Sequence, residues 1–165
     1  MSLRKSDAAD VKRRRAIVNV SFGGMAAMSA VSALQMGIVS HLPDPPIRGF
    51  DSDKVNTSKT AYPFGIPDGT LALSGFAGNI LLAAWGDARR AREEPWIPIV
   101  AAGKALLEAV VAGWYFYQMP TKEKAWCGYC IAGAAANITV AALAIPEAIE
   151  AIKTVGRKAA GSTTT

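Results

Sequence analysis

The stretch "AIVNVSFGGMAAMSAVSALQMGIVSHL", residues 16–42, contains no Asp, Glu, Lys or Arg and decides the class of fold. A helix of this length crosses a hydrocarbon core of about 30 Å with residues to spare. Three further apolar stretches follow it, at about residues 68–86, 96–119 and 125–149. The sequence therefore predicts an all-α membrane protein, in which residues 16–149 form a four-transmembrane-helix bundle.

The charged residues lie mainly between and outside these stretches. Residues 1–15 hold six Lys and Arg residues and form a predicted basic cytoplasmic tail, and residues 150–165 form a predicted polar C-terminal tail. With the N-terminus inside, twelve Lys and Arg residues fall inside and five outside. The positive-inside rule then favours a multi-pass protein with both termini in the cytoplasm. Basic residues that flank apolar spans, without an aromatic-basic surface pattern, also argue against nucleic acid as a partner.

A cleaved signal peptide over residues 1–33 is the alternative for the first stretch. "RRR" precedes the apolar run, and "AVSA" resembles a cleavage site. The run nevertheless continues well past the roughly 7–15 apolar residues of an ordinary signal peptide. A membrane span is therefore the favoured interpretation.

The stretch "WCGYC", residues 126–130, holds the only two cysteines of the sequence. The predicted topology puts Cys127 at the outer end of the fourth span, and an oxidising compartment is where disulfide chemistry normally takes place. A helix N-terminus stabilises a thiolate through its free amides and its dipole. We therefore expect Cys127 and Cys130 to be catalytic, with Cys127 as the exchanging thiol and Cys130 as the resolving one.

Other interpretations of the two cysteines are weaker or remain open. Zinc needs four ligands, and the chain offers only these cysteines and the distant His41. Covalent haem needs a His directly after the second cysteine, where Ile131 stands. Neither a metal nor haem is expected. Two inert helix residues, or a purely structural disulfide, remain possible interpretations.

Polar residues inside the apolar stretches are the other candidates for function. Lys104 and Glu108 lie one helical turn apart, and charge within a membrane usually faces the bundle interior and marks function. They form a possible proton route, or simply a neutralising ion pair. Asn79 and Gln35 suit either hydrogen bonds between helices or contact with a ligand.

The stretch "DKVNTSKTAYPFGIPDG", residues 53–69, is followed by a predicted span, and "WCGYC" later opens the last one. Together these features resemble the vitamin K epoxide reductase (VKOR) family, from the first span to the fourth. The most specific parts are "FGIP", residues 64–67, and the CxxC. The resemblance implies a four-helix bundle that encloses a quinone, such as ubiquinone or menaquinone, under a capping outer loop between helices 1 and 2. It also implies oxidation of a dithiol coupled to reduction of that quinone.

The resemblance also assigns roles to single residues. Cys130 would face the quinone, and Cys127 would exchange with a thioredoxin-like thiol partner on the outer face. Asn137, seven residues after Cys130, matches a polar position of some members. Asn137, Phe64 and Asn79 are thus the candidate quinone-binding residues. For a member of bacterial type, the expected location is the inner (cytoplasmic) membrane, with the CxxC near the periplasmic face.

The sequence departs from the family in the predicted outer loop. The family normally carries a second cysteine pair there, which relays electrons to the CxxC. The corresponding places are near Asp44 and Ser52, and neither is a cysteine. A second function therefore stays open, that of a non-catalytic VKOR-like accessory or structural subunit of a larger membrane complex.

Overall fold

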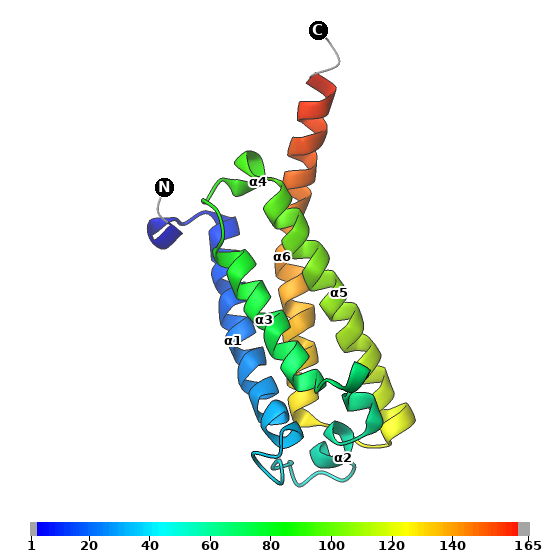
Figure 1. Cartoon of the computed structure of the whole chain (residues 1–165). Coiled ribbons are helices and arrows are strands. Elements are labelled where there is room, and N and C mark those ends of the chain that lie inside the picture. Colours follow the sequence, from blue (N-terminus) through cyan, green and yellow to red (C-terminus); the bar gives the residue numbers. More distant parts are fainter. Residues whose placement is uncertain (1–2, 162–165) are drawn as a thin grey trace.

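The computed structural model describes residues 3–161, and helices make up most of them. Four long helices lie side by side along one axis (Figure 1). They are α1 (Ala9–Gln35), α3 (Asp68–Ala84), α5 (Trp96–Gln118) and α6 (Gly128–Gly161). The helices α2 (Ser52–Asn56) and α4 (Arg90–Glu93) are short, and the remaining helical segments are the 3-10 turns Leu3–Lys5, Lys59–Ala61 and Pro63–Gly65 and the π-helical turn Met119–Glu123.

The long helices have the composition of membrane spans. Among the described residues, three helical stretches are long and apolar enough to cross a membrane, namely Ala9–Gln35, Trp96–Glu123 and Gly128–Ala160. Helix α3 has 17 residues, which corresponds to about 25 Å. The prediction of an all-helical protein with membrane-spanning helices is confirmed, whereas a fourth crossing by α3 stays a prediction.

Helix α1 is shifted toward the N-terminus relative to the predicted span of residues 16–42. It begins at Ala9, within the predicted basic tail, because Lys and Arg are good helix formers. It ends at Gln35 because Gly37 adopts a left-handed φ of 72°. The Gly37 amide donates to the Leu34 carbonyl and the Ile38 amide to the Ala33 carbonyl, the hydrogen bonds of a Schellman motif.

Helix α6 is longer than predicted at its C-terminal end. It continues to Gly161 through residues that we expected to be a polar tail, and residues 162–165 of that tail lie outside the described part of the chain. Ala151 and Thr154 of this extension are buried, and α4 packs against α6. Burial of one face explains why the extension is helical.

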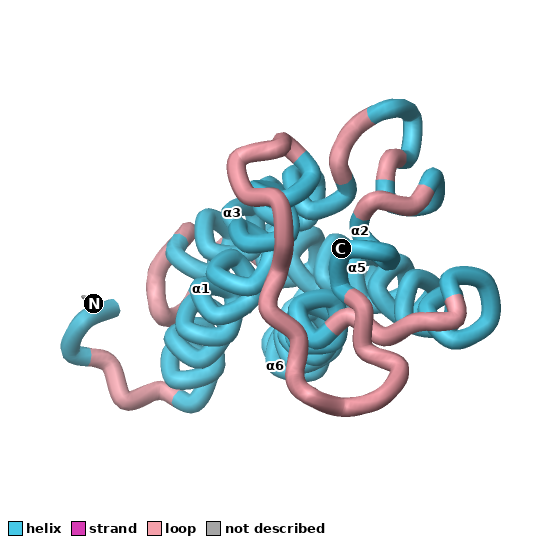
Figure 2. Tube along the Cα trace, turned by 90° about the horizontal axis from the view of Figure 1, so that it is seen from below, coloured by secondary structure: helices cyan, strands magenta, loops and turns pink. Residues whose placement is uncertain are grey.

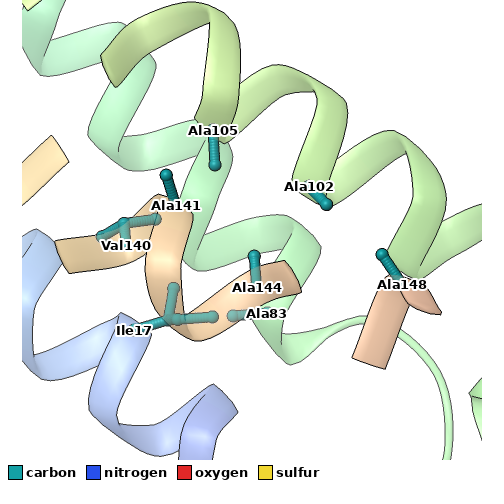
Figure 3. Close-up of a cluster of buried hydrophobic side chains, with 8 residues drawn as sticks. All are labelled: Ile17, Ala83, Ala102, Ala105, Val140, Ala141, Ala144 and Ala148. Carbon is teal, nitrogen blue, oxygen red and sulfur yellow. The ribbon is translucent and has the colours of Figure 1, made fainter. Parts of the chain in front are cut away.

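Helix α6 lies at the centre of the packing, since it contacts both α1 and α5, and α1 also contacts α3. Small side chains let these helices approach closely, as is usual between membrane helices. Figure 3 shows this core, which consists of Ile17, Ala83, Ala102, Ala105, Val140, Ala141, Ala144 and Ala148. By contrast, α3 and α5 make few contacts with each other.

Two buried arginines donate hydrogen bonds to the carbonyls at the C-terminal end of α3. The last carbonyls of a helix have no partner within the helix. Arg14 donates from its guanidinium to the carbonyls of Ala83, Trp85, Gly86 and Asp87. Arg90 donates to the carbonyls of Leu82 and Trp85 and forms a two-pronged ion pair with Glu147 of α6, at 2.7 and 2.8 Å. These contacts fix the end of the bundle where α1 begins.

The segment of residues 36–67 covers the opposite end, which we call the loop end (Figures 1 and 2). This segment is hydrogen-bonded to the chain just before α6. The Trp126 amide donates to the Gly49 carbonyl at 2.8 Å, and the Asp51 amide donates to the Trp126 carbonyl at 3.0 Å. The loop is thereby held beside the CxxC motif.

Candidate functional site

Cys127 lies at the loop end, directly before the first residue of α6. Its side chain is fully buried. The Cys130 amide donates to Cys127 Sγ at 3.1 Å, and the Ile131 amide donates to the Cys127 carbonyl at 3.0 Å. Cys127 thus occupies the position of a helix N-cap, and its sulfur accepts from one of the free amides of the first turn. This arrangement matches the one expected from the sequence.

Asn56, the last residue of α2, lies between the two cysteines and is also buried. Its Nδ2 donates to Cys127 Sγ at 3.2 Å and to the Ser52 carbonyl at 2.7 Å. Its Oδ1 accepts from Cys130 Sγ at 3.3 Å. Asn56 was not predicted as a site residue, because only tertiary packing brings this loop residue to the CxxC. Its place within the stretch that resembles the family was the one available signal.

The surroundings of Cys127 favour its thiolate. The neighbouring Cys130 side chain, the Asn56 amide and the Cys130 backbone amide lower the pKa of Cys127 to about 6, although burial acts in the opposite direction. Both cysteines are free thiols in this structure. Cys127 is therefore equipped for thiol exchange at neutral pH.

A cavity of about 430 Å³ lies next to Cys130. Its wall is mostly apolar and comes from all four long helices and from the segment of residues 36–67. Cys130 and Asn137, two turns apart on α6, both contribute to the wall. Phe64 also contributes to the wall, although its side chain is fully exposed. Apolar lining residues include Met28, Val31, Leu71, Leu107, Val111 and Ala134.

The cavity has the size and the lining of a site for a small organic ligand. Pockets for small organic ligands are typically about 300–1,000 Å³ and are apolar with a few polar groups. Residues with polar side chains also contribute to this wall, and they include Cys130, Asn137, Tyr115, Glu108 and Asp68.

Lys104, Glu108 and Asn79 form one hydrogen-bonded network between α5 and α3. Lys104 Nζ donates to Glu108 Oε1 at 2.5 Å, to Asn79 Oδ1 at 3.0 Å and to the Gly75 carbonyl at 2.7 Å. Asn79 Nδ2 donates to the other Glu108 oxygen at 2.8 Å. Glu108 belongs to the cavity wall, whereas Asn79 and Lys104 are not among the residues that line the cavity. Asn79, which we predicted to bind the quinone, thus contacts the predicted proton route and does not line the cavity.

Asp44 and Ser52 are in contact within the loop. The Ser52 amide and hydroxyl donate to the two carboxylate oxygens of Asp44, at 2.7 and 2.6 Å. Ser52 is also the first residue of α2. These hydrogen bonds connect the start of the loop to the short helix that carries Asn56.

Within residues 3–161, no group of three or more His, Cys, Asp and Glu side chains has the arrangement of a metal site. His41 pairs with Asp53 instead, and that hydrogen bond raises the pKa of His41. Asp53 also accepts from the Leu42 amide at 2.8 Å. His41 therefore helps to hold the loop.

Comparison with known proteins gives one family. The model of the vitamin K epoxide reductase family matches residues 15–145. A search of curated proteins finds no match. The matched range covers most of the chain and includes the loop that carries Asn56, the CxxC motif and the residues that line the cavity. The chain belongs to the vitamin K epoxide reductase family.

Proposed function

We propose that this protein is a membrane thiol–quinone oxidoreductase, which couples oxidation of a partner dithiol to reduction of a quinone through Cys127 and Cys130. Membership of the family supports a function of this kind. One observation carries the proposal, namely that Cys130 belongs both to the hydrogen-bonded CxxC and to the wall of the apolar cavity. The sulfur that must face a quinone is thus next to the space that can hold one.

A quinone bound in the cavity supplies an acceptor for two electrons and two protons. Cys127 and Cys130 provide the electrons when their sulfurs join as a disulfide. With Cys127 as thiolate, the reduced pair carries a single proton, on the Cys130 sulfur that donates to Asn56. The other proton must come from a different group. A partner dithiol then reopens the Cys127–Cys130 disulfide and becomes a disulfide itself.

Glu108 is our candidate for delivery of that other proton, with Lys104 as the group that exchanges protons with it. Its carboxyl group borders the cavity, and its oxygens are held by Lys104 and Asn79. Gly75 lets Glu108 lie against α3, since a Cβ at Gly75 would collide with the Glu108 carboxylate. We propose that Asn79 orients Glu108, while Asn137 and Phe64 contact the quinone.

Glu108→Gln should slow quinone reduction by about 100-fold or more, because a positioned acid typically contributes that much to a proton transfer. Glutamine keeps the shape of the side chain but cannot accept a proton from Lys104 and pass it on. Quinone consumption, followed by absorbance in detergent, gives the rate. The control is Glu93→Gln, which alters an exposed carboxylate paired with Arg89. Equal rates for Glu108→Gln and the unaltered protein would exclude the proton role.

The thiol partner that we propose is thioredoxin-like and meets the loop end. Cys127 is fully buried beneath α2, so such a partner must displace this short helix to reach the sulfur. The same burial, together with Asp44 and Ser52 in place of a cysteine relay, favours the second candidate function of an accessory subunit. Isolation in a mild detergent as a fixed-ratio member of a larger complex, with both cysteines dispensable, would support that alternative.

We further propose that α3 crosses the membrane as the fourth span. Both termini would then be cytoplasmic, and the loop end would face the periplasm of a bacterial inner membrane. The excess of Lys and Arg at the end opposite the loop supports this orientation. The short length of α3 is compatible with a membrane crossing, because transmembrane helices of about 17 residues occur.

A further inference from the structure

We propose that Asn56 is a positioning residue that assigns the thiolate to Cys127 and the proton to Cys130. This inference deepens the proposed thiol–quinone function and rests on it. Asn56 belongs to α2, far from the cysteines in the sequence, and is only 1% exposed. It would not react itself, and would act through the two sulfurs that it contacts.

The orientation of the Asn56 amide follows from its third partner. A carboxamide has one end that only donates and one end that only accepts hydrogen bonds. The Ser52 carbonyl can only accept, and it lies 2.7 Å from Asn56 Nδ2. The donating end is therefore at Ser52 and Cys127, and the accepting end Oδ1 is at Cys130.

This orientation distinguishes the two sulfurs chemically. An N–H that points at a sulfur stabilises the thiolate, whereas an oxygen acceptor stabilises a protonated S–H. Cys127 Sγ receives donors from Asn56 Nδ2 and from the Cys130 amide, at 3.2 and 3.1 Å. Cys130 Sγ instead faces Asn56 Oδ1 at 3.3 Å. If the proton moved from Cys130 to Cys127, a lone pair of Cys130 Sγ would face a lone pair of Asn56 Oδ1. The protonated Cys127 thiol would then face two N–H donors.

The assignment matters for both halves of the proposed reaction. Cys127 Sγ, the exchanging sulfur, is ready to act as nucleophile and as leaving group in exchange with a partner thiol. The sulfur on the cavity wall keeps the proton that must accompany the electrons. Because Asn56 is buried, water does not compete for these hydrogen bonds, and their effect on the two sulfurs is large.

Thiolate absorbance near 240 nm tests the assignment, because it needs neither a reagent that reaches the buried sulfur nor quinone turnover. The reduced full-length protein is titrated in detergent, and the Cys127→Ser spectrum is subtracted to isolate Cys127. The unaltered protein should titrate with a midpoint below that of an ordinary thiol, because two N–H donors face Cys127 Sγ. Asn56→Leu, which keeps the volume and removes the amide, should raise the midpoint by about one pH unit or more.

Asn79→Leu is the matched control, since Asn79 is also a buried asparagine but its amide contacts Lys104 and Glu108. Its Cys127 midpoint should equal that of the unaltered protein. Asn56→Ala is measured beside Asn56→Leu, and thermal melting identifies the folded variants. A folded Asn56 variant with an unchanged midpoint would overturn the assignment. A raised midpoint in a protein that never reduces quinone would retain the assignment and reject the proposed function.

Discussion

Cys130→Ser should abolish quinone reduction by an added dithiol, with a loss of at least about 1000-fold, because the altered residue takes part covalently in the reaction. A serine oxygen cannot form the disulfide that releases the electrons. Serine can still donate to Asn56 Oδ1, the partner of Cys130 Sγ, so the loop end should stay folded. Quinone consumption measured in detergent, together with the melting temperature, checks both expectations.

Thr139→Ala is the control for this experiment. Thr139 lies on the same helix as Cys130, and its hydroxyl donates only to the Ala135 carbonyl within that helix. The control should reduce quinone as fast as the unaltered protein. If Cys130→Ser also keeps full activity, the enzyme proposal is wrong and the accessory-subunit alternative is favoured.

Glu147→Ala should lower the free energy of unfolding by about 3–5 kcal/mol, the usual cost when one partner of a buried ion pair is removed. Arg90 and Glu147 are both nearly inaccessible, and Arg90 also holds the carbonyls at the end of α3. Without Glu147, the Arg90 charge would be buried with carbonyl partners only. Denaturation of the detergent-solubilised protein, followed by circular dichroism, measures the effect.

Glu150→Ala is the matched control, one turn further along α6. Glu150 pairs with Arg92, and both side chains are exposed. The expected loss is at most about 1 kcal/mol, because water screens an exposed pair. The double variant Arg90→Met with Glu147→Leu should recover much of the stability lost by Glu147→Ala. Similar losses for Glu147→Ala and Glu150→Ala would contradict the importance of the buried pair.

The helical architecture was predictable because the charge-free stretches and the residues that begin or end helices are local features of the sequence. Pro95 directly precedes α5, and the CxxC marks the start of α6. Gly37 was a signal for the end of α1 that the predicted span of residues 16–42 overlooked. Helix α1 contacts α3 and α6 within the bundle, whereas its retention in place of cleavage as a signal peptide stays a prediction.

The buried polar contacts were not predictable, because they join residues that are distant in the sequence. Arg14 was interpreted as part of a cytoplasmic tail, yet it is buried and holds the end of α3. Asn56 lies in a loop with several other polar residues, and nothing in the sequence distinguished it from them as a site residue. Lys104 and Glu108 were identified as candidate site residues because charge inside an apolar stretch is conspicuous by itself. Periodicity identifies a face of a helix but not its partner across the bundle.

The redox state of Cys127 and Cys130 in living cells shows whether this CxxC passes electrons to the quinone pool. Cells with a normal or a depleted quinone pool are quenched in acid, and free thiols are then labelled with a maleimide that shifts the protein on a gel. We expect an unlabelled disulfide with the normal pool and labelling of both cysteines after quinone depletion. The same labelling in both conditions would contradict a role for this CxxC in quinone reduction.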